Sequence, residues 1–233
     1  MDRDVCIRSR AGQVLLALAS LASPWAAAQS YCSSDGQTQP ARLLERFISA
    51  DCESCWAGGT EPAQPDELAL DWIVPGGRGE EAPLSAAASR DALARLAALG
   101  RQPPVEIDAA RLVVQAPRRG LRVSHGLPFN GYLGTSLELK SPDRQPWSAW
   151  LLLVETIPAG SDGTPIERNL VRNALQLAWP AAAGQARLFE ARPMNIPEGA
   201  HPDRLRVVGW VQDGRGRMRA IAQSRCAPAG AGG

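Results

Sequence analysis

The sequence predicts an α+β fold in which a small α/β unit is followed by a β-rich unit. Two short apolar segments and one helical stretch precede residue 105. After Pro103 and Pro104 the pattern changes to a series of strand-like segments, and the chain closes on a hairpin. We therefore expect a first unit over residues 29–105 and a β-rich unit over residues 106–233.

The first unit is expected to contain two buried strands and one helix. Residues 42–49 and 68–74 are short apolar runs bounded by turn residues, which is typical of buried strands. Residues 85–99 are rich in Ala, Leu and Arg, with apolar side chains at helical spacing. Gly100 follows as a natural helix stop.

The second unit is expected to consist mainly of strands. Strand-like segments separated by turn residues lie at 111–115, 121–124, 133–140 and 147–155. The apolar residues of 167–179 fit both a strand and a helix face. Residues 205–212 and 218–223 flank a Gly-rich turn, which predicts a terminal hairpin.

The first 28 residues have the pattern of a cleavable signal peptide. A start with three Arg precedes an apolar run at 14–22, and Ala26, Ala27 and Ala28 supply small residues for cleavage. That run is much shorter than the roughly 20 residues of a spanning helix. We expect cleavage after Ala28, a periplasmic or secreted mature protein, and no membrane anchor in the mature form. The weaker alternative is that the apolar run forms a helix of the folded protein, because this would not explain the small residues that follow it.

The charge of the predicted mature chain argues against a nucleic-acid partner. Residues 1–28 hold three of the 25 basic and two of the 24 acidic residues, which leaves 22 of each. Binding to nucleic acid depends on a basic surplus, and this chain has none.

The cysteine count predicts two disulfides in the exported protein. Cys6 leaves with the signal peptide, and Cys32, Cys52, Cys55 and Cys226 remain. Four cysteines allow three connectivities. A Cys32–Cys226 bond would join the two ends of the mature chain, and closing so long a loop is worth about 4–5 kcal/mol in the chain-entropy model. Cys52 is then left to pair with Cys55.

Cys52 and Cys55 are the one group of residues in the sequence that indicates a reactive site. Two cysteines at this spacing can form a reversible disulfide, in which one thiolate attacks a partner disulfide and the second thiol resolves the mixed species. The attacking thiol is activated when its environment favours the thiolate.

Residues 45–55, ERFISADCESC, resemble the E-L-F-T-S-Q-G-C-S-S-C signature of an uncharacterised bacterial secreted family with a thioredoxin-like fold. Residues 150–155 and 168–172, followed by Trp179, also resemble segments in that family's β-rich second half. The resemblance implies a thioredoxin-like unit over 29–105, with Cys52 as the attacking thiol and Cys55 as the resolving thiol. It also implies a strand at 168–179.

The chain departs from that family at three places, one of which is the family's H-V-D-Y-W segment, here Asp71-Trp-Ile-Val-Pro. After Cys55 it continues Trp56-Ala-Gly-Gly-Thr instead of P-P-A-D and a helix. The family's cis-proline segment has its nearest counterpart, by appearance, at Pro128. Asp71 could serve as a proton acceptor for the Cys pair, although a surface position near a turn is the stronger expectation.

Three functional readings follow from the sequence. The first is thiol–disulfide exchange with protein thiols or disulfides, and the second is a non-catalytic, disulfide-stapled binding or structural module. The third, a metal site of Cys52 and Cys55 with His125 or His201, is disfavoured because a closed zinc site needs four protein ligands. No phosphate-binding Gly loop or hydrolase Ser elbow occurs, so no cofactor is expected.

Overall fold

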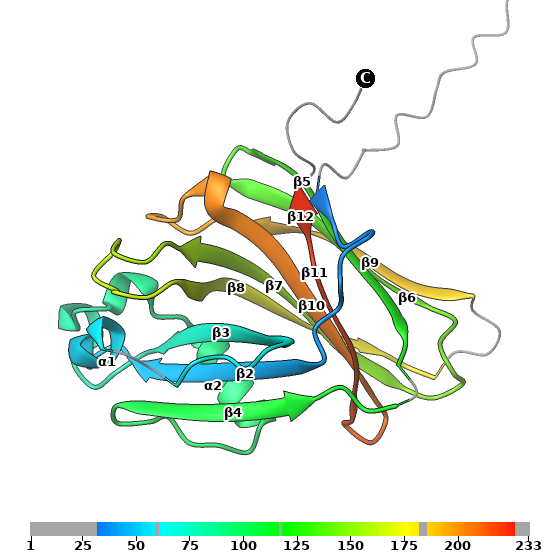
Figure 1. Ribbon diagram of the computed structural model, residues 1–233, viewed down its shortest axis with the longest axis horizontal. Coiled ribbons are helices and arrows are strands. Elements are labelled where there is room, and N and C mark those ends of the chain that lie inside the picture. Colours follow the sequence, from blue (N-terminus) through cyan, green and yellow to red (C-terminus); the bar gives the residue numbers. More distant parts are fainter. Residues whose placement is uncertain (1–31, 59–60, 117, 182–185, 227–233) are drawn as a thin grey trace, which may run out of the picture.

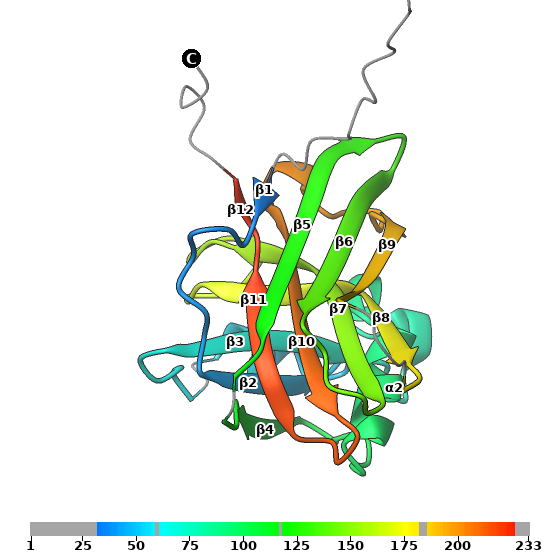
Figure 2. The ribbon, with the colours of Figure 1, turned by 90° about the vertical axis from the view of Figure 1, so that its right-hand side faces the viewer.

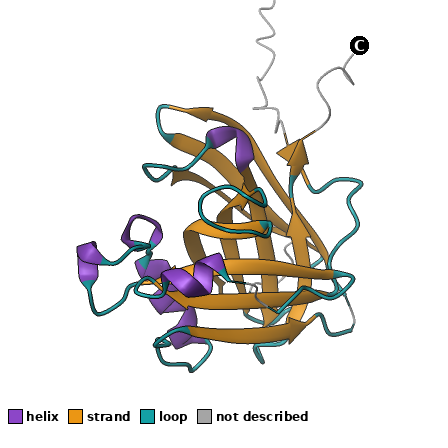
Figure 3. Cartoon of the chain, turned by 60° about the vertical axis from the view of Figure 1, so that its left-hand side comes forward, coloured by secondary structure: helices purple, strands orange, loops and turns teal. Residues whose placement is uncertain are grey.

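The computed structural model describes residues 32–58, 61–116, 118–181 and 186–226. The predicted signal peptide, residues 1–28, lies outside the described residues. Strands account for 49% of the described residues and helices for 12%. The strands form two sheets, and most of the helical turns gather on one side of the molecule (Figure 3).

The larger sheet has seven strands in the order β11-β10-β7-β8-β3-β2-β4 (Figure 1). Its strands are β2 (Arg42–Ser49), β3 (Glu67–Val74), β4 (Ile107–Val113), β7 (Trp147–Ile157), β8 (Arg168–Trp179), β10 (Leu205–Asp213) and β11 (Met218–Gln223). β2 runs parallel to β3, and β3 runs parallel to β8. The pairs β2–β4, β7–β8, β7–β10 and β10–β11 are antiparallel.

The smaller sheet has five strands in the order β12-β1-β5-β6-β9. Its strands are β1 (Cys32–Ser33), β5 (Gly120–Phe129), β6 (Tyr132–Lys140), β9 (Arg187–Asn195) and β12 (Arg225–Cys226). Figure 2 shows β5 and β6 in front of β10 and β7 of the larger sheet. All pairings in this sheet are antiparallel.

The predicted α+β class with a thioredoxin-like N-terminal unit is wrong, because the protein is β-rich. The described residues contain two α-helices, the five-residue α1 (Glu53–Ala57) and α2 (Arg90–Ala98). β2 and β3 are buried on both faces along nearly their whole length. α2 packs on one of these faces, and Trp56 of α1 packs on part of the other. The sheet extends into the second half of the chain where β3 pairs with β8. The larger sheet is therefore continuous across residue 105.

The larger sheet has a core on each face. The face toward the five-stranded sheet packs residues such as Leu151 and Val207 against Val123 and Leu137. The opposite face packs residues such as Phe47 and Trp210 beneath α2. A smaller third cluster lies around Trp56 of α1.

Gly209 on β10 lies where the two sheets pack closely together. A Cβ atom at this position would lie 2.7 Å from Cδ1 of Leu137 and 2.9 Å from Cγ1 of Val123. Real Cβ atoms do not approach other heavy atoms so closely, so the absent side chain lets the sheets pack together.

Most predicted strands are confirmed, and several elements differ in their bounds or were not predicted. The ambiguous segment at 167–179 is strand β8, and the strand predicted at 111–115 begins four residues earlier as β4. The helix predicted at 85–99 is shorter, because Ser89 forms the N-cap of α2 by accepting a hydrogen bond from the Asp91 backbone N–H. A turn of 3₁₀ helix occupies Ser85–Ala87 instead. β9 was not predicted, since most of its residues are exposed and its apolar alternation is weak.

Candidate thiol–disulfide site

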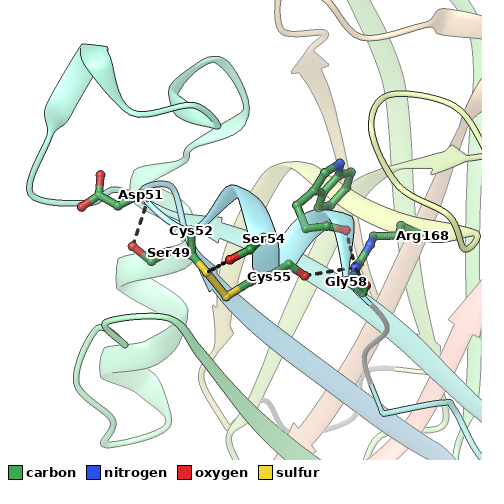
Figure 4. The surroundings of a disulfide bond; sticks show 8 residues. Ser49, Asp51, Cys52, Ser54, Cys55, Gly58 and Arg168 are labelled. Carbon is green, nitrogen blue, oxygen red and sulfur yellow. Dashed lines mark hydrogen bonds between the residues drawn. A yellow bond between two sulfur atoms is a disulfide. The ribbon is translucent and has the colours of Figure 1, made fainter.

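Cys52 and Cys55 form a disulfide at the point where β2 leads into α1 (Figure 4). Both cysteines are half-buried. β2 ends at Ser49, whose hydroxyl accepts a hydrogen bond from the Asp51 backbone N–H at 3.3 Å. We call residues 50–58 the Cys turn. The Asp51 carboxylate accepts a hydrogen bond from the backbone N–H of Gly77 at 2.7 Å, and this bond connects the Cys turn to the loop after β3.

The Ser54 hydroxyl lies 3.5 Å from the Cys52 sulfur. A disulfide sulfur carries no hydrogen, so the hydroxyl is the donor. The same hydroxyl can donate to a Cys52 thiolate once the disulfide is reduced, and a hydrogen bond to the charged form favours that form. Ser54 is therefore the polar side chain placed to support Cys52 as the attacking group.

Arg168 lies beneath the Cys turn and holds its carbonyl groups. It is fully buried, and its guanidinium donates to the carbonyls of Trp56 at 2.7 Å, Gly58 at 3.0 Å and Cys55 at 3.3 Å. Carbonyls at the end of a helix lack partners within the helix. Arg168 supplies those partners from β8, more than 100 residues further along the chain.

Asp71 balances the charge of Arg168. This fully buried carboxylate lies 3.2 Å from Nη1 of Arg168 and 2.8 Å from Nε of Arg46. Burial lowers the pKa of Arg168 below its ordinary value, and attraction to Asp71 opposes that shift. The expectation of a surface Asp71 is wrong, because the residue is the buried counter-ion of two arginines.

Trp56 anchors the turn on its other side. Its indole N–H donates to the Asp162 carbonyl at 2.6 Å, and its ring lies 4.8 Å from the guanidinium carbon of Arg168. Arg168 also donates through Nε to the Thr164 hydroxyl at 3.0 Å. The loop between β7 and β8 thus fixes the Cys turn from the second half of the chain.

A cavity of about 600 Å³ opens beside the Cys turn. Its walls come from the turn and helix, the segment after α1 and the start of β4, with Arg46, Ser54, Cys55, Gly58, Glu61, Ile107, Asp108 and Ala109. Ile107 is partly exposed, so the cavity offers an apolar wall together with charges of both signs. A ligand in this cavity would lie against one half of the disulfide.

The other predicted site residues lie elsewhere. Cys32 and Cys226 form the second disulfide and join β1 to β12, so both predicted pairings are present. His125 is the strand neighbour of Cys32 in the five-stranded sheet. His201 bonds Glu155 at 2.9 Å. Pro128 lies on β5 of the five-stranded sheet, opposite Leu133 on β6.

Sequence reasoning missed the joint role of Arg168 and Asp71 at this site. The available signal was one charge of each sign inside two strand-like apolar segments. Charged side chains are almost never fully buried unless they are paired. Two such residues in segments that both become central strands therefore predict an ion pair, although the sequence does not say which strands are neighbours.

Comparison of the chain with protein-family models, curated proteins and solved structures finds no match. The resemblance to a bacterial secreted family therefore stays a prediction. None of the described helices is long and apolar enough to cross a membrane.

Proposed function

We propose that this is an exported protein that exchanges thiols and disulfides with other proteins through Cys52 and Cys55. One observation carries the proposal: the Cys52–Cys55 disulfide is half-exposed beside a cavity while the backbone around it is held by buried groups. An incoming thiolate needs access to a sulfur atom, and exposed disulfides are the labile ones. Export to an oxidising compartment, as the first 28 residues predict, agrees with the two disulfides.

The exchange would proceed in two steps. The Cys52 thiolate attacks one sulfur of a substrate disulfide, forms a mixed disulfide and releases the first substrate thiolate, which takes a proton from solvent. The Cys55 thiol then loses its proton and attacks the Cys52 sulfur, which releases the second substrate thiol. The Cys pair gives up two electrons and the substrate gains them. The Ser54 hydroxyl, 3.5 Å from the Cys52 sulfur, would stabilise the first thiolate.

Thiol trapping across a series of redox buffers tests the proposal. We expect Cys52 and Cys55 to interconvert with their disulfide at potentials near those of known exchange proteins, about −270 to −120 mV. The Cys55→Ser variant should capture a partner as a mixed disulfide through Cys52, and the Cys52→Ser variant is the matched control. A pair that stays oxidised below about −300 mV, with no capture by Cys55→Ser, would leave the disulfide as a structural bond.

The second candidate is a disulfide-stapled module without exchange activity. It is favoured by the three carbonyl contacts of Arg168, which make the Cys turn part of the packed interior. In that case the double Cys52→Ser, Cys55→Ser variant should lose stability, while no partner thiol reacts with the parent protein. The redox titration above separates the two functions.

A further inference from the structure

A row of three sulfur- and nitrogen-bearing side chains crosses the five-stranded sheet. Cys226 on β12 lies opposite Cys32 on β1, and Cys32 lies opposite His125 on β5. Directly opposed residues on neighbouring strands project from the same face of a sheet. Both sulfur atoms and a ring nitrogen of His125 lie within 4.8 Å of one another.

His125 has a nitrogen that the surrounding protein leaves without a partner. The side chain is 5% exposed, its Nδ1 bonds the Gly126 carbonyl at 2.8 Å, and its Nε2 has no hydrogen-bond partner among the described residues. Since a carbonyl only accepts, Nδ1 carries the proton and Nε2 presents its lone pair. A metal-binding histidine typically donates its other ring N–H to a carbonyl in this way.

The row also has an entry path. β12 is the edge strand of its sheet, and Cys226 is exposed, whereas Cys32 and His125 are buried.

We propose that the Cys32–Cys226 disulfide and a zinc site are alternative states of this row. A dithiol reductant transfers two electrons and two protons to the disulfide and becomes a disulfide itself. The two thiols then release two protons as Zn²⁺ binds both thiolates and the His125 imidazole. Three protein ligands, at distances of about 2.0–2.3 Å, leave the fourth tetrahedral position to water, so this would be an open zinc site and not a closed one with four protein ligands. The metal would then replace the covalent bond in joining β1 to β12.

A zinc titration tests this site without the other cysteine pair. The parent for the experiment is the full mature chain with Cys52→Ser and Cys55→Ser, treated with a phosphine reductant and titrated with Zn²⁺ against a chromogenic chelator. We expect one zinc per chain after reduction and none in the oxidised protein. His125→Gln should weaken binding by at least about 10-fold, and His201→Gln, at the other histidine, should leave it unchanged.

Cobalt absorption provides a second readout, which does not depend on the folding of the His125 variant. Co²⁺ added to the reduced parent should give thiolate charge-transfer bands and the d–d spectrum of a tetrahedral site. An absence of zinc binding after reduction would overturn the proposal. So would equal zinc affinity in folded His125→Gln, or a cobalt spectrum without thiolate bands. Failure of this site would not affect exchange at Cys52 and Cys55, which the experiment leaves out.

Discussion

Arg168 and Asp71 meet at 3.2 Å with both side chains fully buried, although 97 residues separate them in the chain. The pair joins β8 to β3 at the register Asp71–Leu170, where the second half of the chain completes the sheet begun by the first. On its other side Arg168 holds the carbonyls of the Cys turn. The ion pair thus couples the interior of the sheet to the candidate site.

Replacing Arg168 by Met should destabilise the fold by about 3 kcal/mol, because removing one partner of a buried ion pair leaves the other uncompensated. The loss should fall at the low end of the usual range, since Arg46 still pairs with Asp71. Chemical denaturation of the oxidised protein measures the change. An effect below about 1 kcal/mol would mean that the pair is not needed for the fold.

Arg168→Lys separates the charge from the carbonyl contacts. An ammonium group keeps the positive charge next to Asp71 but lacks the planar fork that reaches several acceptors at once. We expect Cys52–Cys55 to be reduced faster in this variant than in the parent, with a smaller loss of stability than in Arg168→Met. Timed trapping with iodoacetamide under limiting dithiothreitol measures the rate. An unchanged rate would show that the carbonyl contacts do not restrain the turn.

Ser54→Ala tests the hydroxyl beside the attacking sulfur. Without that donor the Cys52 thiolate loses a hydrogen bond, so the pKa of the reduced Cys52 thiol should rise and its alkylation near neutral pH should slow. Ser54 is exposed, and the folding stability should change by less than about 0.5 kcal/mol. The pH dependence of alkylation in a Cys55→Ser background gives the shift. An identical pH profile in Ser54→Ala would remove Ser54 from the proposed chemistry.

Gly209→Ala should destabilise the protein by about 1–3 kcal/mol, because the new methyl group would overpack the interface between the sheets. Gly134→Ala on β6 is the matched control, since a Cβ there meets no atom within 4 Å. Thermal unfolding of the two variants gives the comparison. Equal melting temperatures would contradict the close approach of β10 to β5 and β6.

The strands could be predicted from sequence because their apolar runs are bounded by Gly, Pro and polar turn residues. β2 was placed at residues 42–49, and its observed bounds are the same. The fold class could not be predicted in this way, because it depends on which strands become neighbours. A run such as 68–74 indicates burial on both faces, but the pattern is the same whether helices or another sheet provide the cover. The resemblance favoured helices, and in the structure α1 has only five residues.

In the candidate site, too, the local features could be predicted from sequence and the long-range contacts could not. The Cys52–Cys55 and Cys32–Cys226 pairings followed from the even cysteine count and the spacing, which are local or arithmetic properties. The contacts of Arg168 with the Cys turn join residues more than 100 positions apart. The pairing of β3 with β8 brings them together, and no local pattern encodes that pairing.

Asp213 gives the hairpin between β10 and β11 a defined acid sensitivity. Burial raises the pKa of its carboxyl, but hydrogen bonds from the Arg217 side chain and from backbone N–H groups outweigh this, so the pKa lies below its ordinary value. A carboxyl with a depressed folded-state pKa stabilises the fold above its unfolded pKa of about 3.9, and that contribution is lost as the pH falls through the folded value. We expect Asp213→Asn to cost about 1–3 kcal/mol at pH 7 and less below pH 4. Urea unfolding at several pH values measures both, and a cost independent of pH would contradict the assignment.

Glu45 on β2 and Arg95 on α2 form a second buried ion pair, and they provide the last prediction. Nη2 of Arg95 lies 2.6 Å from the Glu45 carboxylate, which also accepts the Trp72 indole N–H at 3.1 Å. The guanidinium of Arg95 lies about 5 Å from the rings of Trp150 and Trp210, so α2 is held to the sheet by charge and by stacking together.

Glu45→Gln keeps the shape of the side chain but removes the charge that balances Arg95. We expect a loss of about 3–5 kcal/mol, the usual cost of leaving one buried charge without its partner. The double variant Glu45→Gln, Arg95→Met should recover part of this loss, because no unpaired charge then remains inside the protein. Urea unfolding followed by tryptophan fluorescence reports on the tryptophans that contact this pair. If the double variant were less stable than Glu45→Gln by the full cost of Arg95→Met alone, the two side chains would be acting independently, and packing of Arg95 on the tryptophans would carry the stabilisation.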